Sequence, residues 1–266
     1  MQKNKIYKGD TLELIEEIGD DSIDLIIADP PYGIEVDFGG KEKWGLDKHS
    51  EWLSWMKKWL KEAERVLKPE GSIFVYGIHH NIGYIQCYLY DIGLIYGRQF
   101  VWHYKNNWSG YTKLPPGNYE PLLWFHKGGK YTYHPIREAY ESTERLKYKI
   151  IKNGKEWKPN PEGKHVGDVW RIPVLAGKSF AKERVDHPTQ KPIAICDRII
   201  RHFSNKGDIV LVPFAGSGSE CVSAKKNGRD FIGIELNGDY VKIANGRLRG
   251  IDTSAELNVV AEKVLG

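Results

Sequence analysis

The sequence predicts an α/β fold built on a doubly wound, mostly parallel sheet. Nearly continuous apolar runs of strand length, such as residues 24–28 and 208–212, suit strands that are covered on both faces. Each run is followed by a helical stretch and a further strand-like run, so a β-α-β unit occurs near each end of the chain. With 266 residues, of which 41% are hydrophobic and 28% charged, the chain can form one large domain with an insertion.

The first of these units begins with the strand 24–28, which places Asp29 at its carboxyl end. Residues 49–68 carry apolar side chains at helical spacing, and the Pro-Glu-Gly that follows ends this helix. Residues 72–76 form the next strand. Two prolines follow Asp29 and cannot donate to a strand ladder, so the first strand must stop there and its last side chains become available for function.

The middle of the chain is less regular. Residues 98–103 and 121–126 are strand candidates, separated by a polar segment that contains proline. From 127 to 186 the periodicity fades into Tyr, Lys, Pro and Gly, which indicates an inserted segment. We therefore expect residues 1–126 and 187–266 to form one body.

The basic charge of the chain is regional. Residues 127–191 hold fifteen Lys and Arg against eight Asp and Glu, although the whole chain has a net charge of only +4. Such a surplus is typical of a section that faces a polyanion, and a solvated basic loop explains it equally well.

Regular structure returns with a helix at 192–203 and a strand at 208–212. A glycine-containing turn follows at 213–218, then a helix to about Asn227 and a strand at 231–236. Glycines in such a turn let the backbone approach a ligand, and the next helix offers free N–H groups.

An acid at the end of the last strand favours a nucleoside as that ligand. Glu235 lies 17 residues beyond Gly218, in the layout by which doubly wound folds bind ribose hydroxyls. Without this acid, a tight turn with no ligand would be the better interpretation. No Lys-Ser or Lys-Thr follows Gly218, so the turn is not an ATPase phosphate loop, and a nucleoside with an uncharged or cationic sulfur group suits it better.

Taken together, the motifs resemble those of the β-class, circularly permuted DNA amino-methyltransferases, in which Asp-Pro-Pro-Tyr precedes the turn that binds S-adenosylmethionine (SAM). The resemblance covers nearly the whole chain apart from the insertion. It rests on these segments, in this order: Lys8-Gly9-Asp10-Thr11-Leu12, Asp29-Pro30-Pro31-Tyr32, Arg65-Val66-Leu67-Lys68-Pro69, Val101-Trp102-His103-Tyr104-Lys105, Tyr119-Glu120-Pro121-Leu122-Leu123, Gly167-Asp168-Val169-Trp170, His187-Pro188-Thr189-Gln190-Lys191-Pro192, Pro213-Phe214-Ala215-Gly216-Ser217-Gly218 and Gly233-Ile234-Glu235. It implies a Rossmann-like, SAM-dependent methyltransferase fold.

The residue types at 29–32 fit amino-group methylation. The amino nitrogen of a nucleobase is a poor nucleophile because its lone pair is delocalised into the ring. Acceptors against both N–H groups favour a pyramidal nitrogen and stabilise its developing positive charge. The Asp29 carboxylate supplies one acceptor, a carbonyl of the rigid Pro30–Pro31 stretch supplies the other, and Tyr32 is expected to stack on a base extruded from the duplex. The alternative is that Asp29 caps a helix and Tyr32 packs on the sheet.

The resemblance also implies cofactor-binding residues. It assigns Asp10 to the adenine end of SAM, Glu235 to the ribose and Lys191 to the methionine carboxylate. His187 lies in the same segment as Lys191 and is assigned to the cofactor site with it. The methionine end is assigned to Phe214, Ala215, Gly216, Ser217 and Gly218. One departure is visible, since Val212 stands where the family usually has Asp, so either cofactor binding is weakened or Asp29 has two tasks.

The insertion is then expected to be the target-recognition region. Its arginines would contact guanines or phosphates, and the sequence does not separate these two roles: Arg137, Arg145, Arg171 and Arg184. Its tyrosines and Trp157 are interpreted as a small core rather than base-stacking platforms. The histidines lack metal-ligand spacing, so we predict no metal.

These features predict SAM-dependent methylation of the adenine N6 amino group in a specific sequence of double-stranded DNA. Asp at position 29 favours adenine by family usage, and N4-cytosine methylation is the runner-up. A catalytically weakened nucleic-acid-binding homologue, and a methyltransferase for RNA or protein, are the other classes considered. The resemblance names a homodimer and a restriction endonuclease as candidate partners. Three dispersed cysteines and no long uncharged run favour a cytoplasmic protein without a membrane partner.

Overall fold

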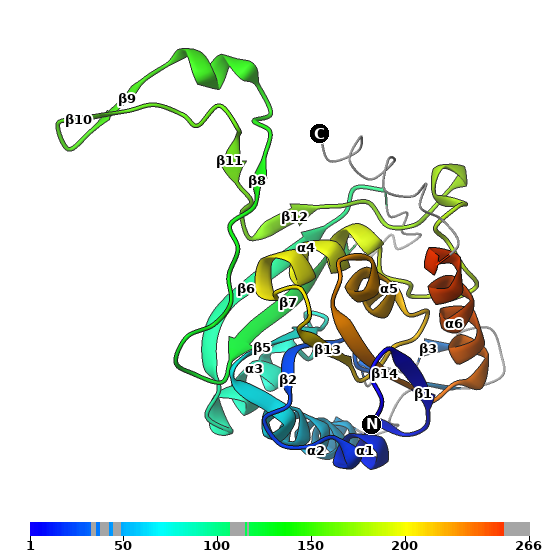
Figure 1. The fold of residues 1–266 in the computed structure, drawn as a ribbon. Coiled ribbons are helices and arrows are strands. Elements are labelled where there is room, and N and C mark those ends of the chain that lie inside the picture. The colour runs from blue at the N-terminus through cyan, green and yellow to red at the C-terminus, as the bar shows by residue number, and fades with distance from the viewer. Residues whose placement is uncertain (33–35, 38–42, 45–48, 107–114, 116, 253–266) are drawn as a thin grey trace.

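The computed structural model describes residues 1–252 except 33–35, 38–42, 45–48, 107–114 and 116 (Figure 1). Its centre is an eight-stranded sheet in the spatial order β1-β14-β13-β2-β5-β7-β6-β12. The strands of this sheet are β1 (Lys5–Lys8), β2 (Ile23–Ala28), β5 (Leu67–Tyr76), β6 (Ile95–His103), β7 (Tyr119–His126), β12 (Val169–Arg171), β13 (Ile209–Val212) and β14 (Asp230–Glu235). The first five in spatial order are parallel, whereas β7 runs antiparallel to both of its neighbours.

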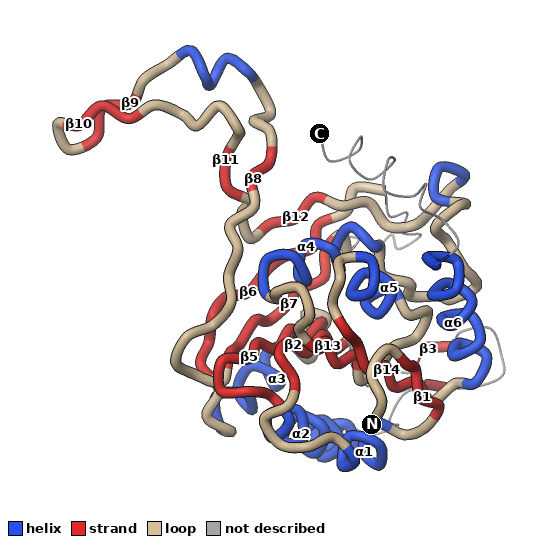
Figure 2. Tube along the Cα trace, viewed as in Figure 1, coloured by secondary structure: helices blue, strands red, loops and turns tan. Residues whose placement is uncertain are grey.

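Helices cover both faces of the sheet (Figures 1 and 2). One face carries α1 (Thr11–Leu14), α2 (His49–Val66) and α3 (Ile82–Asp91), and the other carries α4 (Ile193–Phe203), α5 (Ser219–Lys226) and α6 (Gly238–Asp252). A short 3-10 helix, η1 (Ile15–Glu17), follows α1. This arrangement confirms the predicted doubly wound fold.

The strand β2 shows how the sequence builds two cores. Leu25 and Ile27 contribute to the core on the α4–α6 side, whereas Ile26 and Ala28 contribute to the core on the α1–α3 side. All four side chains are fully buried. A strand alternates its side chains between faces, so a strand covered on both faces must be apolar throughout.

The topology creates a switch point between β2 and β13. These neighbours pair in parallel, with Leu211 opposite Ile26. The chain leaves β2 toward α2 on one face and leaves β13 toward α5 on the other. In doubly wound sheets, the crevice for ligands opens at such a point, beyond the carboxyl ends of the strands.

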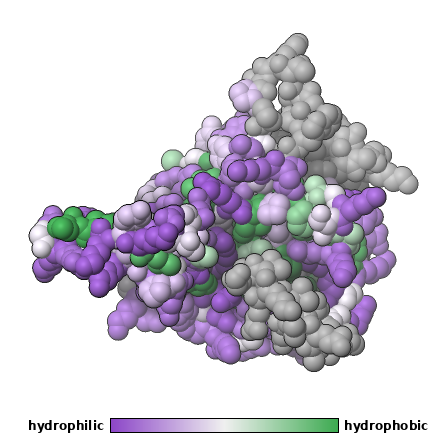
Figure 3. All heavy atoms as spheres, turned by 90° about the horizontal axis from the view of Figure 1, so that it is seen from above, coloured by the Kyte–Doolittle hydropathy of each residue, from purple (hydrophilic) through white to green (hydrophobic). Residues whose placement is uncertain are grey.

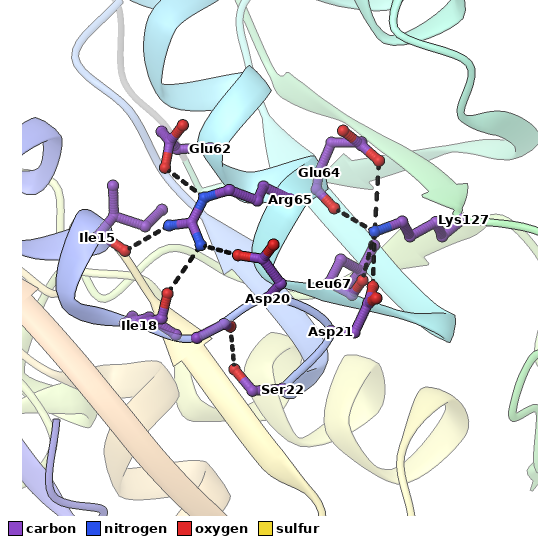
Figure 4. A network of polar contacts seen from close by, with 11 residues as sticks. Ile15, Ile18, Asp20, Asp21, Ser22, Glu62, Glu64, Arg65, Leu67 and Lys127 are labelled. Carbon is purple, nitrogen blue, oxygen red and sulfur yellow. Dashed lines mark hydrogen bonds and ion pairs between the residues drawn. The ribbon is translucent and has the colours of Figure 1, made fainter.

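A polar network fixes the connection between α2 and β5 (Figure 4). Arg65, in the last turn of α2, donates hydrogen bonds to two carbonyls and two carboxylates: Ile15, Ile18, Asp20 and Glu62. Lys127, directly after β7, donates to Asp21 and to the carbonyls of Glu64 and Leu67. Both cations therefore connect segments at the end of the sheet where β2 and β5 begin, which is opposite the end where the ligand crevice opens.

The segment expected to be an insertion is only partly separate. Its residues 137–165, which we call the arm, project from the body (Figures 1 and 3). The arm contains β8 (Arg137–Glu138), η2 (Thr143–Lys147), β9 (Ile150–Lys152), β10 (Lys155–Trp157) and β11 (Lys164–His165). It consists of two antiparallel ribbons, β8 with β11 and β9 with β10.

Residues after the arm rejoin the body. β12 pairs in parallel with β6, and its Trp170 is 1% exposed within the core beside α4. A three-residue strand with a single buried residue gives too weak a periodicity to be found from sequence. The body therefore includes residues that the predicted boundaries of 127 and 186 assigned to the insertion. A further 3-10 helix, η3 (Lys178–Phe180), lies between β12 and α4.

The other predicted elements lie where expected, with ends shifted by a few residues. The sequence analysis missed β1, α1, α3 and α6, as well as a short ribbon of β3 (Val36–Asp37) and β4 (Lys43–Trp44). Across the described part of the chain, no helix combines the length and hydropathy needed to cross a membrane.

Candidate active site

A cavity of about 370 Å³ opens at the switch point, where the predicted turns after β2 and β13 meet. It is lined by residues 29–32 after β2, 213–217 after β13, 187–191 before α4 and 234–236 at the end of β14. The volume is in the range of small-molecule and cofactor sites. Two segments about 180 positions apart in sequence therefore share one site, as the sequence analysis required.

At the centre of the site, Asp29 is held by two side chains. Its Oδ1 accepts a hydrogen bond from the Tyr32 hydroxyl at 2.6 Å, and its Oδ2 lies 2.8 Å from Nζ of Lys191. The same Nζ lies 3.1 Å from Oε2 of Glu120. The Lys191 side chain is 4% exposed, so one buried ammonium lies between two carboxylates.

Charge balance decides the protonation of this cluster. Burial alone would lower the pKa of Lys191, but the carboxylates of Asp29 and Glu120 outweigh it and raise that pKa above its usual range. Burial raises the pKa of Glu120, and Lys191 offsets only part of that effect because it is shared with Asp29. Lys191 is therefore a cation at neutral pH that holds Asp29 in place, and its contact with a ligand carboxylate stays a prediction.

Tyr32 is half-buried and bonded to Asp29 instead of standing free as a stacking platform. Burial and the adjacent Asp29 raise the pKa of its phenol, so Tyr32 stays a hydrogen-bond donor. Its ring also lies 5.9 Å from the Lys191 ammonium. The hydroxyl thus occupies the Asp29 oxygen that an amino group would need.

The carbonyls of this segment are not equivalent. The Pro31 carbonyl accepts a hydrogen bond from the indole of Trp52 at 2.8 Å, and the Tyr32 carbonyl accepts one from Asn81 at 2.9 Å. Among the described residues, none donates a hydrogen bond to the carbonyl of Pro30. Pro30 is therefore the proline whose carbonyl can serve as a second acceptor beside Asp29.

The glycine turn needs glycine at both positions. Gly216 and Gly218 have φ angles of 48° and 77°, which residues with a Cβ rarely adopt. A Cβ at Gly218 would lie 2.7 Å from the Cβ of Ala244 in α6, and a Cβ at Gly216 would lie 2.8 Å from Nε2 of His187. The turn is thus pressed closely between α6 and the segment before α4.

Glu235 organises this turn from the end of β14. One carboxylate oxygen accepts the N–H of Gly216 at 2.7 Å, and the other accepts the N–H of Asn237 at 2.8 Å. Burial raises the pKa of Glu235, and these backbone hydrogen bonds offset part of the shift. Each oxygen keeps a lone pair, so the carboxylate can still accept from ribose hydroxyls.

Further side chains complete the walls. Asp10 caps α1 by accepting the N–H of Leu12 at 2.8 Å. The Thr11 hydroxyl donates to the Pro213 carbonyl and ties this cap to the glycine turn. Phe214 packs against the rings of Trp55 and Trp59, with centroids 5.5 and 5.2 Å away.

His187 is a neutral part of the wall. Its ring lies 4.3 Å from that of Tyr240. Burial lowers the pKa of His187 to about 4, and this outweighs the opposing effect of Asp29. His187 therefore carries no charge near pH 7 and suits an uncharged portion of a ligand.

The end of β13 carries no acid, as the sequence already showed. Val212 is 1% exposed and belongs to the core on the α4–α6 side. Glu220, in the first turn of α5, instead contributes a buried carboxyl group to the cavity wall.

The arginines predicted to bind DNA lie apart from the described cavity lining. Arg137 contacts the Gly163 carbonyl within the arm, and Arg171 pairs with Glu141 at 2.9 Å. Arg184 lies between η3 and α4, and the side chain of Arg145 is outside the described part of the structure.

Sequence reasoning missed Glu120 and Glu220 as site residues. Glu120 is the second residue of β7, and an antiparallel strand brings its beginning to the edge where the parallel strands end. The direction of β7 was therefore the signal that could have found it. Glu220 had only a weak signal, since an acid in the first turn of a helix is common.

Fold and site together define a class: a Rossmann-like sheet with a glycine turn, an acidic strand end and an Asp-Pro-Pro-Tyr segment, all at one switch point. The sequence profile of the DNA methylase family matches residues 23–246, so the chain belongs to this family of SAM-dependent amino-methyltransferases. The chain is similar to the type II methyltransferase M1.MboII of Moraxella bovis, with 32% identity over 92% of this chain and 96% of that protein. It is also 37% identical to the DNA adenine methyltransferase YhdJ of Escherichia coli (strain K12), over 91% of this chain and 82% of that one.

Solved structures agree with this assignment. The M1.HpyAVI–SAM complex superposes with a TM-score of 0.63 and 25% identity, covering 92% of this chain and 98% of the other. The PvuII DNA methyltransferase, described as cytosine-N4-specific, has a TM-score of 0.65 and 21% identity, covering 91% and 85%. The latter similarity supports the fold alone.

The residues at the switch point fit SAM. The glycine turn lines the cavity at Gly216, where a side chain would collide with His187. The walls hold several carboxyl groups and one buried ammonium, which suits a ligand that carries a sulfonium and an ammonium. SAM is the cofactor of the family, and when bound it supplies an electrophilic methyl group.

Proposed function

We propose that this protein methylates the N6 amino group of adenine within a specific sequence of double-stranded DNA. The observation that carries the proposal is the pair of acceptors at the cofactor cavity. The Asp29 carboxylate is fixed by Lys191, and the neighbouring Pro30 carbonyl has no hydrogen-bond partner among the described residues. Two fixed acceptors side by side match the two N–H groups of one amino nitrogen.

The residues would act on the amino group by fixing its geometry and charge. The Asp29 and Pro30 oxygens accept its two N–H groups, turn its lone pair out of conjugation and stabilise the positive charge that develops on nitrogen. Lys191 keeps the carboxylate oriented through Oδ2, which leaves Oδ1 for the substrate. In this proposal the amino group replaces the Tyr32 hydroxyl at Oδ1, and the released ring stacks on the base.

The target base must leave the duplex to reach a site at the end of a sheet. Extrusion costs a few kcal/mol, which stacking on Tyr32 would partly offset. The arm projects beside the body and carries eight Lys and Arg against five Asp and Glu. We assign it to DNA contact, with Arg137 and Arg145 on the arm and Arg171 and Arg184 on the body.

Adenine is preferred for two reasons. The chain has Asp at position 29, which the family resemblance associates with adenine, and YhdJ is an adenine methyltransferase by its description. The alternative is N4-cytosine, because the two amino groups have the same hydrogen-bonding pattern and the PvuII enzyme shares the fold.

The test is incubation of the protein with SAM and mixed-sequence DNA, followed by mass spectrometry of the nucleosides. We expect N6-methyladenine, and none from the Asp29→Ala variant, which should still bind SAM. Detection of methylcytosine without methyladenine would show that the target base is cytosine instead of adenine. A near-normal rate in the variant would remove Asp29 from the chemistry.

A further inference from the structure

We propose that Glu220 is the acid that binds the α-ammonium group of the methionine portion of SAM. This inference rests on the proposed function, because it assumes that SAM occupies the cavity at the switch point. It assigns to a residue of α5 a contact that the chain cannot make from the end of β13, where Val212 is buried in the core.

The first support is an unsatisfied oxygen. Glu220 is 5% exposed and lines the cavity, yet its Oε1 has no hydrogen-bond partner among the described residues. Leaving a buried carboxylate oxygen unpaired is unfavourable, because nothing replaces the hydrogen bonds it makes with water. Such a group in the wall of a ligand cavity is explained if the ligand brings the missing donor.

The Cys196 thiol, a weak donor, faces the Glu220 carboxyl group, and the stronger donors nearby, among the described residues, do not reach its Oε1. The Arg247 guanidinium of α6 donates to Ser217 and Ser219. The Tyr76 hydroxyl of β5 is also buried and without a partner among the described residues. The Lys191 ammonium is bound by Asp29 and Glu120.

The other acids of the cavity are already engaged. Both oxygens of Asp29 accept hydrogen bonds or ion pairs, and both oxygens of Glu235 accept backbone N–H groups. Asp10 caps α1. Among these carboxyl groups, only Glu220 combines near-complete burial with an oxygen that lacks a partner.

The missing donor selects between the two cations of SAM. An ammonium carries three N–H donors and can satisfy Oε1 directly. A sulfonium carries none, so it would neutralise charge but leave the oxygen unpaired. The α-ammonium is therefore the better partner for Glu220.

The contact has a measurable consequence for protons. Burial and then the charge of Asp29 raise the pKa of Glu220 to about 7, with smaller opposing effects from Lys191 and the Cys196 thiol of α4. Without ligand, Glu220 is thus partly protonated near pH 7. A bound ammonium favours the carboxylate, so binding near pH 7 should release protons from the protein.

The experiment compares ligands that differ in one group. S-adenosylhomocysteine and its analogue without the amino group are titrated calorimetrically into the wild type and Glu220→Gln, in buffers of different ionisation enthalpy. The wild type should bind the amino ligand about 10–100-fold more tightly than the analogue, as a charge-assisted hydrogen bond would give. In Glu220→Gln, this ratio should fall to about threefold or less, and the proton release should disappear.

Controls separate this role from a structural one. Ser223→Ala changes another buried residue of α5, which bonds Asp197 away from the cavity, and should leave the ligand ratio intact. If Glu220→Gln does not fold, Glu220→Asp is used instead, and the shorter carboxylate should reduce the ratio without abolishing it. Equal weakening of both ligands, or an unchanged ratio, overturns the proposal.

The result also separates this inference from the proposed function. If Glu220→Gln weakens SAM but not S-adenosylhomocysteine, the acid faces the sulfonium, and the ammonium assignment is wrong. If the wild type binds neither nucleoside, both the inference and the cofactor assignment fail. If the wild type binds them but methylates no adenine, only the adenine proposal fails.

Discussion

Replacing Lys191 by Met tests whether one buried ammonium holds the active-site carboxylate. Methionine keeps an unbranched apolar stem and removes the charge. The side chain is 4% exposed, and its Nζ lies 2.8 Å from Asp29 and 3.1 Å from Glu120. Breaking a buried ion pair by removing one partner costs about 3–5 kcal/mol. We therefore expect Lys191→Met to lower the free energy of unfolding by about that amount at pH 7.

The pH dependence of this loss has a defined sign. In the wild type, the pKa of Lys191 is raised, so its stabilisation is complete below the pKa of an unfolded lysine and is lost as pH rises through the folded pKa. In the variant, the partly buried carboxylates of Asp29 and Glu120 lack their shared cation, so burial raises the folded pKa of Glu120 further above its unfolded value. Folding then favours proton binding, so Lys191→Met should regain stability as pH falls from 7 toward 5.

Urea unfolding of three variants measures these effects. Lys191→Met/Glu120→Gln should recover part of the loss, because only Asp29 then remains charged. Lys242→Met is the control: its partner Asp239 lies at 2.8 Å, but both side chains are about 80% exposed, and such pairs contribute little. A loss below about 1 kcal/mol in Lys191→Met, or no recovery in the double variant, would contradict the buried ion pair. If Lys191→Met does not fold, the same reasoning requires that Lys191→Met/Glu120→Gln folds.

Three further predictions concern the turn, α5 and the arm. Gly218→Ala should destabilise the protein by about 1–3 kcal/mol and weaken SAM binding, whereas Gly246→Ala, in open space on α6, should be neutral or slightly stabilising; equal melting temperatures would refute this. Glu220→Gln should stabilise the ligand-free protein by up to about 3 kcal/mol above pH 7, because the wild type loses stability as pH rises from 4.5 through 7; parallel pH profiles of unfolding would exclude it. Replacing residues 140–162 by a short turn should reduce the salt dependence of DNA binding and leave binding of S-adenosylhomocysteine unchanged, and an unaltered salt slope would show that the arm does not contact phosphates.

Local sequence patterns predicted the site to the extent that strand ends define it. Asp29 and the glycine turn each follow a buried strand, and parallel strands bring their carboxyl ends to one edge, so their meeting was predictable. The contacts that Asp29 makes with other side chains were not predictable in this way. Lys191 comes from a loop before α4, and Glu120 comes from an antiparallel strand. No local pattern indicates that these two segments meet beside Asp29, where the Lys191 ammonium contacts both carboxylates. The role expected for Lys191, pairing with a ligand carboxylate, therefore differs from the ion pairs in the structure.

The same reasoning explains why the arm was predicted only in outline. Fading periodicity and basic charge located it, but β12 is too short to show that the chain returns to the sheet at Trp170. This return matters for function because it fixes both ends of the arm to the body: one end follows residues that contact α4 through His202, and the other leads into β12.

If the arm recognises the target, as we propose, cofactor binding and target recognition belong to parts of the chain that can be separated. Every residue that lines the described switch-point cavity comes from the body, and none comes from 137–165. The arm joins the body through the short ribbon of β8 and β11, so we expect a change in its length or sequence to leave the hydrogen bonds of Asp29, Glu235 and Lys191 in place. A protein built in this way should accept a different arm and methylate the same amino group in a different sequence. Loss of SAM binding on exchange of the arm would show that the two parts are coupled after all.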